Sequence, residues 1–216
     1  NHVYANQAPR LAAAELALCC PQVRGAEPIV LAGVEYIALE IDDAEQPLDP
    51  AILRAFGETP EDVRHNLTRE LEALEAHLKT READWTRVQP DREWSPAQDI
   101  EHIIAVGKGG SMAAKLLLSG KELRAFPHVP GELKDGKRQS PEFARPSATG
   151  LAWDAWPGAW AEHRQQLEGL AAGLRETPDR KLWHPYFGEI DAVDWLRSLA
   201  GHVRGHRELL EKSAAQ

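Results

Sequence analysis

The stretch ETPEDVRHNLTRELEALEAHL, residues 58 to 78, decides the fold class of this chain. Thr59 can cap the first turn of a helix, and Pro60 is favoured directly after such a cap. The apolar residues that follow recur every three or four positions, and they are Val63, Leu67, Leu71, Leu74 and Leu78. This spacing places them on one face of a helix. The stretch therefore predicts an amphipathic helix over about residues 60 to 83, whose apolar face must be covered by partners.

Three further stretches carry apolar residues at the same spacing. Ser95 is placed to cap a second helix, expected over about residues 96 to 119. A third helix is expected over about residues 151 to 175 and a fourth over about residues 191 to 213. Pro157 should disturb the first turns of the third helix, because proline cannot donate a backbone hydrogen bond.

The connection between the second and third helices is long. Residues 120 to 150 combine glycine, proline and scattered charge, which is typical of an irregular connection. Four amphipathic helices with one long crossover and no strand among them predict a mainly α fold, an up-down four-helix bundle. We expect this bundle to occupy residues 58 to 216.

The first 57 residues differ in character from the rest. The segment APRLAAAELALCC, residues 8 to 20, is helix-like. The segment EPIVLAGVEYIALEID, residues 27 to 42, holds two β-rich runs around Gly33, as in a hairpin or a pair of strands. Residues 1 to 57 are therefore predicted to form a small α/β appendage, whose role the sequence does not indicate.

Composition excludes several classes of partner. The net charge of -9 and the pI near 5.5 would repel a phosphate backbone, so we expect no nucleic-acid binding. No run of about 18 apolar residues could span a bilayer, so we expect no membrane insertion. The only cysteines, Cys19 and Cys20, are too few for a disulfide framework, and the first residues do not resemble a secretory signal. These features favour a cytoplasmic protein.

Near the end of the chain, the stretch LAGHVRGHRELL, residues 199 to 210, contains two histidines four positions apart. His202 and His206 should share one helix face and continue the apolar stripe of Trp195 and Leu199. Two imidazoles at this spacing can bind one metal ion. Separate hydrogen-bonded histidines at the surface or in the core account for the same spacing.

A third ligand would be needed to hold a divalent ion tightly. His102 is the best candidate, because it lies at the edge of the apolar arc of the second helix, between Ile100 and Ile103. Three histidines with an open fourth position are typical of catalytic zinc sites.

Other residues are weaker candidates for a functional role. His184, in the turn before the fourth helix, could contact substrate or transfer a proton, or it could only shape the turn. Trp153, Trp156 and Trp160 could line a ligand pocket, but tryptophans at helical spacing more often build core.

The order of these motifs resembles a known family. EWSPAQDIEHI at residues 93 to 103, a long crossover, and HPYFGEIDAVDWLRSLAGHVRGH at residues 184 to 206 are similar to the DinB/YfiT-like superfamily of bacterial four-helix bundles. The resemblance covers about residues 58 to 213. It implies a divalent metal ion, with Zn²⁺ or Ni²⁺ favoured, held at the positions of His102, His202 and His206.

Two classes of function are compatible with this resemblance. The first is a metal-dependent enzyme, a thiol S-transferase or a small-molecule hydrolase, in which the ion lowers the pKa of a bound water or thiol. Its substrate would be a small molecule such as a low-molecular-weight thiol, and the nearby polar choices for a base are Asp99, Glu101 and His184. The second is a non-catalytic, metal-stabilised stress-response or partner-binding module. A homodimer is compatible with either class.

Overall fold

The computed structural model describes residues 2–5, 23–24, 28–31, 34–41, 47–90, 92–124, 128–134 and 137–214. Backbone contacts divide the chain into two compact units, residues 1–46 and 47–216. The predicted domain boundary at residue 57 stays a prediction.

The first unit contains one antiparallel arrangement of strands around β4 (Val34–Ile41). β1 (His2–Ala5), β2 (Val23–Arg24) and β3 (Pro28–Leu31) each pair antiparallel with β4. β3 and β4 coincide with the two predicted β-rich runs, and they pair antiparallel. The predicted helix at residues 8 to 20, together with both cysteines, lies outside the described residues.

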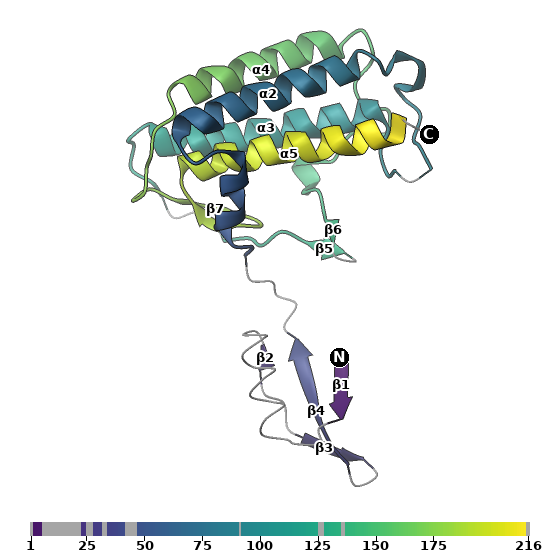
Figure 1. Cartoon of the computed structure of the whole chain (residues 1–216), viewed down its shortest axis with the longest axis vertical. Coiled ribbons are helices and arrows are strands. Elements are labelled where there is room, and N and C mark those ends of the chain that lie inside the picture. Colours follow the sequence, from purple (N-terminus) through teal and green to yellow (C-terminus); the bar gives the residue numbers. More distant parts are fainter. Residues whose placement is uncertain are drawn as a thin grey trace. The chain divides into compact units, whose positions relative to one another are not determined.

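The second unit is mainly helical, as predicted. Its long helices are α2 (Pro60–Leu78), α3 (Pro96–Leu118), α4 (Trp156–Ala172) and α5 (Ala192–Ala214). Both α2 and α3 pack against both α4 and α5 (Figure 1). A short 3-10 helix, η1 (Pro50–Phe56), also packs against α5.

The starts of α2 and α3 confirm the predicted caps. The Thr59 hydroxyl accepts a hydrogen bond from the Asp62 N–H at 3.2 Å, and the Asp62 carboxylate accepts one from the Thr59 N–H at 3.0 Å. Ser95 and Gln98 form the same reciprocal pair at the start of α3. Each pair satisfies two backbone donors that the first turn of a helix leaves free, which fixes where the helix begins.

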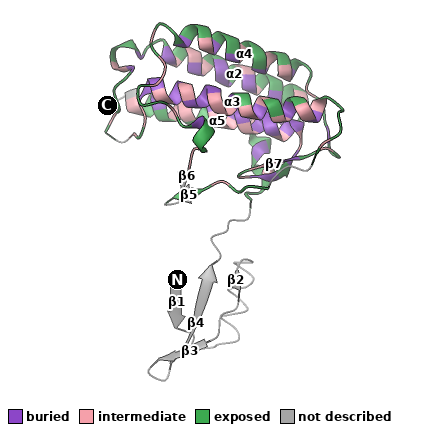
Figure 2. Cartoon of the chain, turned by 180° about the vertical axis from the view of Figure 1, so that it is seen from behind, coloured by how far each residue is buried: buried purple, intermediate pink, exposed green. Residues whose placement is uncertain are grey.

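The core lies between these helices (Figure 2). The predicted stripe of α2 is completely buried: Val63, Leu67, Leu71, Leu74 and Leu78 are each 0% exposed. Trp156 and Trp160 are 2% and 1% exposed, so these two tryptophans are core residues. The third helix begins later than predicted, at Trp156, because Pro157 occupies its first turn.

The connection from α3 to α4 and the connection from α4 to α5 contain short strands, so the expectation of no strand among the helices was wrong. In the crossover, β5 (Leu133–Lys134) pairs with β6 (Lys137–Arg138), and a 3-10 turn, η3 (Glu142–Ala144), follows. Before α5, β7 (Leu182–His184) pairs with β8 (Gly188–Ile190). Strands of two or three residues are too short to show a period of two in the sequence.

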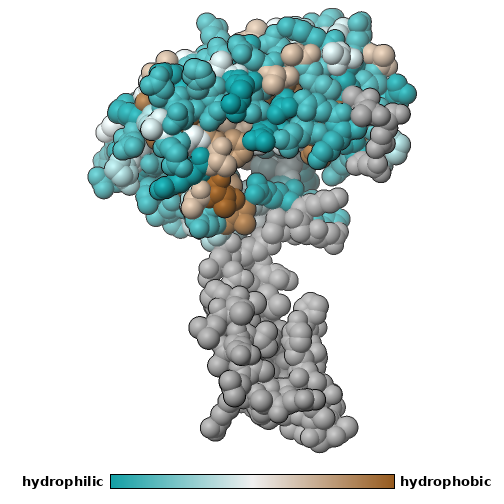
Figure 3. All heavy atoms as spheres, viewed as in Figure 1, coloured by the Kyte–Doolittle hydropathy of each residue, from teal (hydrophilic) through white to brown (hydrophobic). Residues whose placement is uncertain are grey.

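The face of the helical unit shown in Figure 3 is mostly hydrophilic, as the charge of the chain predicts. A small hydrophobic area lies at η1, where Ile52 is 53% exposed. Among the described residues, none of the helices combines the length and the apolar character needed to cross a membrane.

Candidate metal centre

The three histidines singled out in the sequence lie together in the structure. His102 comes from α3, and His202 and His206 come from successive turns of α5, which packs against α3. Each offers one ring nitrogen, and these three atoms lie within 4.8 Å of one another. His102 Nε2 and His202 Nε2 are 3.0 Å apart, which is a hydrogen-bond distance.

The ring of His102 is oriented by the crossover. Its Nδ1 lies 2.7 Å from the carbonyl oxygen of Ala144 in η3. Because a carbonyl can only accept, Nδ1 carries the hydrogen and Nε2 presents its lone pair to the centre. The Ser140 hydroxyl lies 3.3 Å from the same Nδ1. This contact could not be predicted, because the crossover has only the composition of an irregular connection.

The ring of His206 is oriented by a buried carboxylate. Its Nδ1 lies 3.0 Å from Oδ1 of Asp99, which is 0% exposed. The other Asp99 oxygen accepts a hydrogen bond from the Arg92 guanidinium. Asp99 was considered as a base, but this geometry makes it an orienting residue that leaves Nε2 of His206 facing the centre.

Glu101, the second carboxylate considered as a base, is also occupied. It accepts hydrogen bonds from the backbone N–H and the hydroxyl of Ser147, at 2.9 and 2.8 Å. It therefore ties the end of the crossover to α3.

The electrostatic environment keeps two of the histidines neutral. Burial lowers the pKa of His102 to about 4. Burial also lowers the pKa of His202 well below its usual range, and the neighbouring His206 and His102 lower it further. A neutral imidazole has the free lone pair that a metal ion requires, so these two rings are ready to bind at neutral pH.

Trp94 closes one side of the centre. Its ring centroid lies 4.7 Å from that of His102, and it stacks on His206 at 6.3 Å with an interplanar angle of 4°. This tryptophan lies just before the Ser95 cap, so the start of α3 brings it to the histidines.

His184 is not part of the three-histidine group. Its Nδ1 accepts a hydrogen bond of 3.1 Å from the Tyr186 backbone N–H, so this histidine does shape the turn between β7 and β8. Because Nδ1 accepts, the hydrogen of the neutral ring is on Nε2. Burial, and secondarily the charge of Arg138, lowers the pKa of His184 to about 4.

The donor set fits a divalent ion. Nitrogen ligands at about 2.0–2.1 Å in tetrahedral geometry lie about 3.3 Å from one another. The observed span, from 3.0 Å between His102 and His202 to 4.8 Å, brackets this value and requires only small rotations of the side chains. Within the described part of the chain, no carboxylate or thiol joins the group, so a fourth position would be open.

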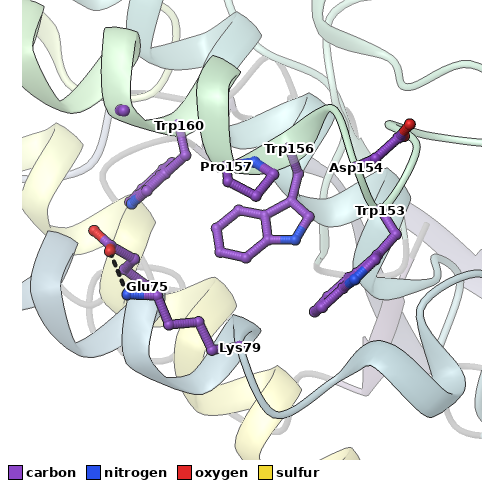
Figure 4. A pocket seen from close by; sticks show the side chains of 8 residues that line it. Glu75, Lys79, Trp153, Asp154, Trp156, Pro157 and Trp160 are labelled. Carbon is purple, nitrogen blue, oxygen red and sulfur yellow. Dashed lines mark hydrogen bonds and ion pairs between the residues drawn. The ribbon is translucent and has the colours of Figure 1, made fainter.

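A recess away from the three histidines is lined by residues of α2 and by residues at the start of α4 (Figure 4). Its volume is about 390 Å³, and its lining is Glu75, Lys79, Trp153, Asp154, Trp156, Pro157, Trp160 and Ala161. It shares no lining residue with the three histidines. The Glu75 carboxylate in this recess is already paired with Lys79 at 2.7 Å and with Arg164 at 3.0 Å.

The helical unit brings three histidines together from two packed helices. This arrangement indicates the class of helical proteins that can bind a metal ion. The comparison with protein families agrees: the family model of the DinB superfamily matches residues 59–210, and the chain belongs to this superfamily. Comparisons with curated proteins and with solved structures found no match.

Proposed function

We propose that residues 58 to 216 form an up-down four-helix bundle of the DinB type, and that residues 1 to 57 form an α/β appendage whose last part, η1, packs against α5 of the bundle. Packing of α2 and α3 against both α4 and α5 supports the bundle. In this bundle His102, His202 and His206 hold one divalent ion, Zn²⁺ or Ni²⁺.

The observation that carries the proposal is the orientation of the rings. His102 donates its Nδ1 hydrogen to the Ala144 carbonyl, and His206 donates its own to Asp99. Partners of this kind accompany nearly all metal-binding histidines, because they fix the tautomer and the direction of the remaining nitrogen. Histidines that only filled a core would not need Nε2 atoms directed at a common point.

The function that this centre supports best is a metal-dependent transfer of a small thiol. A bound ion with an open position lowers the pKa of a thiol or a water at that position. Hydrolysis also needs a base to accept a proton from water, and both nearby carboxylates, Asp99 and Glu101, are engaged in other contacts. A thiol ionises more easily, with a reference pKa of about 8.5, so it depends less on such a base. Hydrolase activity is the alternative reaction.

The protein's own residues would position the substrate. Trp94 excludes water from one side of the centre, and the crossover at Ser140 and Ala144 borders another. The proposal includes a cytoplasmic location, since low-molecular-weight thiols are kept reduced in that compartment. It also includes a homodimer.

A non-catalytic module is the second candidate. Asp99 and Glu101 favour this module, because both carboxylates already accept hydrogen bonds from other residues and neither is free to act as a base. Such a module would bind the ion for stability and would use another surface for a stress-response partner.

The test combines metal content with thiol transfer. We expect about one Zn²⁺ or Ni²⁺ per chain in protein purified without an affinity tag, and its loss in His102→Ala, His202→Ala and His206→Ala. His65→Ala is the matched control, because His65 is exposed on α2. Each sample is then assayed for transfer of small thiols to an electrophile such as monobromobimane. Metal bound without any turnover would favour the module, and full metal retention in His102→Ala would refute the centre.

A further inference from the structure

Arg138 lies at the rim of the candidate metal centre. Arg138 is the last residue of β6, in the crossover. Two residues further along the chain, the Ser140 hydroxyl lies 3.3 Å from Nδ1 of His102. The Arg138 guanidinium carbon lies 5.4 Å from the ring centroids of both Tyr186 and Phe187. The ring of Phe187 in turn lies 4.9 Å from that of His184.

The position of Arg138 is held by hydrogen bonds between the crossover and the β7–β8 hairpin. The Tyr186 hydroxyl donates to the carbonyl of Gln139 at 2.6 Å. The Gly131 backbone N–H donates to the Pro185 carbonyl at 2.9 Å. A Cβ atom at Gly131 would lie 2.2 Å from the Tyr186 ring, so only glycine allows this close approach. The segment that carries Arg138 is therefore attached next to His184.

The charge of Arg138 has no carboxylate partner among the residues that the structure describes. The less exposed arginines of the unit differ from it: Arg180 donates hydrogen bonds to backbone carbonyls, and those with a carboxylate partner are Arg81, Arg92, Arg164, Arg197 and Arg207. Its charge adds to burial in lowering the pKa of the neighbouring His184.

His184 adds a second donor. Its Nδ1 is occupied by the Tyr186 N–H, so Nε2 carries the hydrogen, and no acceptor for it is found in the described part of the chain. A guanidinium and a neutral imidazole N–H together match a planar carboxylate, which accepts hydrogen bonds at two oxygens.

We propose that Arg138 and His184 form an anion-binding subsite, and that the substrate is a small thiol carrying a carboxylate that binds there while its sulfur reaches the metal centre. This inference rests on the proposed function and specifies its substrate class. Arg138 is a specificity-determining residue in this arrangement.

The test compares two thiols that differ in charge. Full-length protein loaded with Co²⁺ is titrated with 3-mercaptopropionate and with 2-mercaptoethanol, and binding is followed by the thiolate-to-cobalt absorption band. We expect wild type to bind 3-mercaptopropionate about tenfold or more tightly than 2-mercaptoethanol, as one charge-assisted contact allows. Arg138→Gln should lower the affinity for 3-mercaptopropionate about tenfold more than the affinity for 2-mercaptoethanol, which removes the preference.

Three further variants refine the test. Arg138→Lys keeps the charge but loses the planar fork, so it should retain part of the preference. His184→Asn keeps an acceptor for the Tyr186 N–H but places no N–H at the position of Nε2, so it should also weaken the preference. Arg124→Gln, an exposed arginine in the same crossover, is the matched control and should behave as wild type.

The possible failures are distinguishable. If wild type shows no absorption band with either thiol, the proposed thiol chemistry fails and the subsite with it. If wild type binds both thiols equally, or if the preference persists in Arg138→Gln, the subsite is refuted and the proposed function stands.

Discussion

Asp99 is the residue that links the candidate metal centre to the core. Its carboxylate is fully buried and contacts both His206 and Arg92. A buried charge of this kind is retained only with partners, since removing one of them leaves the other uncompensated. The orientation of His206 therefore depends on an acid one turn before His102.

Replacing Asp99 should weaken metal binding without removing a ligand. In Asp99→Asn the His206 hydrogen bond loses its charged acceptor, so we expect the affinity for Zn²⁺ to fall by roughly 10- to 100-fold. Competition with a chelator measures this change. Glu101→Gln is the control, because Glu101 contacts Ser147 and not a histidine. Equal affinities of Asp99→Asn and wild type would contradict an orienting role.

His163 should make the protein sensitive to acid. It is 2% exposed, its Nε2 has no hydrogen-bond partner among the described residues, and burial lowers its pKa to about 4. In the unfolded chain it takes up a proton below about pH 6.5, whereas the folded protein resists protonation down to about pH 4. Its contribution to folding stability is thus intact above pH 6.5 and is lost as the pH falls through that interval.

Unfolding by urea at several pH values checks this expectation in metal-free protein. His163→Leu should reduce the loss of unfolding free energy between pH 6.5 and 4 by up to about 3 kcal/mol. The comparison isolates His163, because the other buried histidines titrate in both proteins. Parallel pH profiles would show that His163 is not protonated on unfolding.

At the residue scale, part of the centre could be predicted. The spacing of His202 and His206 determines a shared helix face, and His102 follows the apolar arc of α3. The partners Asp99 and Ala144 could not be predicted, because their contacts depend on the packing of α3 and on the path of the crossover. The contacts of Arg138 with Tyr186 and Phe187 could not be predicted for the same reason.

At the scale of elements, close approach between α3 and α4 depends on a glycine. A Cβ atom at Gly107 would lie 2.1 Å from Cε1 of His163, so α4 uses the space that a side chain would need. At Gly109 the nearest contact of a Cβ atom would be the edge of Phe143, at an ordinary 3.5 Å. Two glycines of one helix therefore have different roles.

These two positions give a paired test. Gly107→Ala should lower the free energy of unfolding by about 1–3 kcal/mol, because the core cannot accept the methyl group without movement. Gly109→Ala should raise it by up to about 1 kcal/mol, since alanine favours helix. Chemical denaturation measures both, and destabilisation of equal size at the two sites would contradict the argument.

Helix starts could be predicted where the sequence contains a capping pair. Thr59 and Ser95 determined the starts of α2 and α3, because caps act within a few residues. The start of α4 was misplaced, since no capping side chain precedes Trp156. The β7–β8 hairpin was missed because its turn depends on Gly188 at φ 67° and on the His184 contact, which a short segment does not reveal.

For the whole molecule, the extent of the helical unit can be tested by shortening the chain. η1 supplies the buried Leu53, and Arg197 of α5 donates hydrogen bonds to the carbonyls of Gly57 and Glu58. A chain of residues 47–216 should fold with the stability of the full protein. A chain of residues 58–216 should still fold but lose about 1.5–3 kcal/mol, the contribution of one buried leucine.

Thermal and urea unfolding of the three proteins check this prediction. If residues 58–216 are as stable as residues 47–216, η1 contributes nothing and the domain begins at residue 58. If residues 47–216 fail to fold, the first unit is required for the second.

Two neighbouring nitrogens of the centre belong to His102 and His202, which are 100 positions apart in the sequence. Contacts of such separation form late, since the loop between them must be closed first. During synthesis the centre cannot be assembled before His206 has left the ribosome, by which time α2, α3 and α4 have been made. Loading of the ion would thus mark the end of folding: an interrupted or misfolded chain that keeps only His102 would remain unloaded and could be recognised as unfinished.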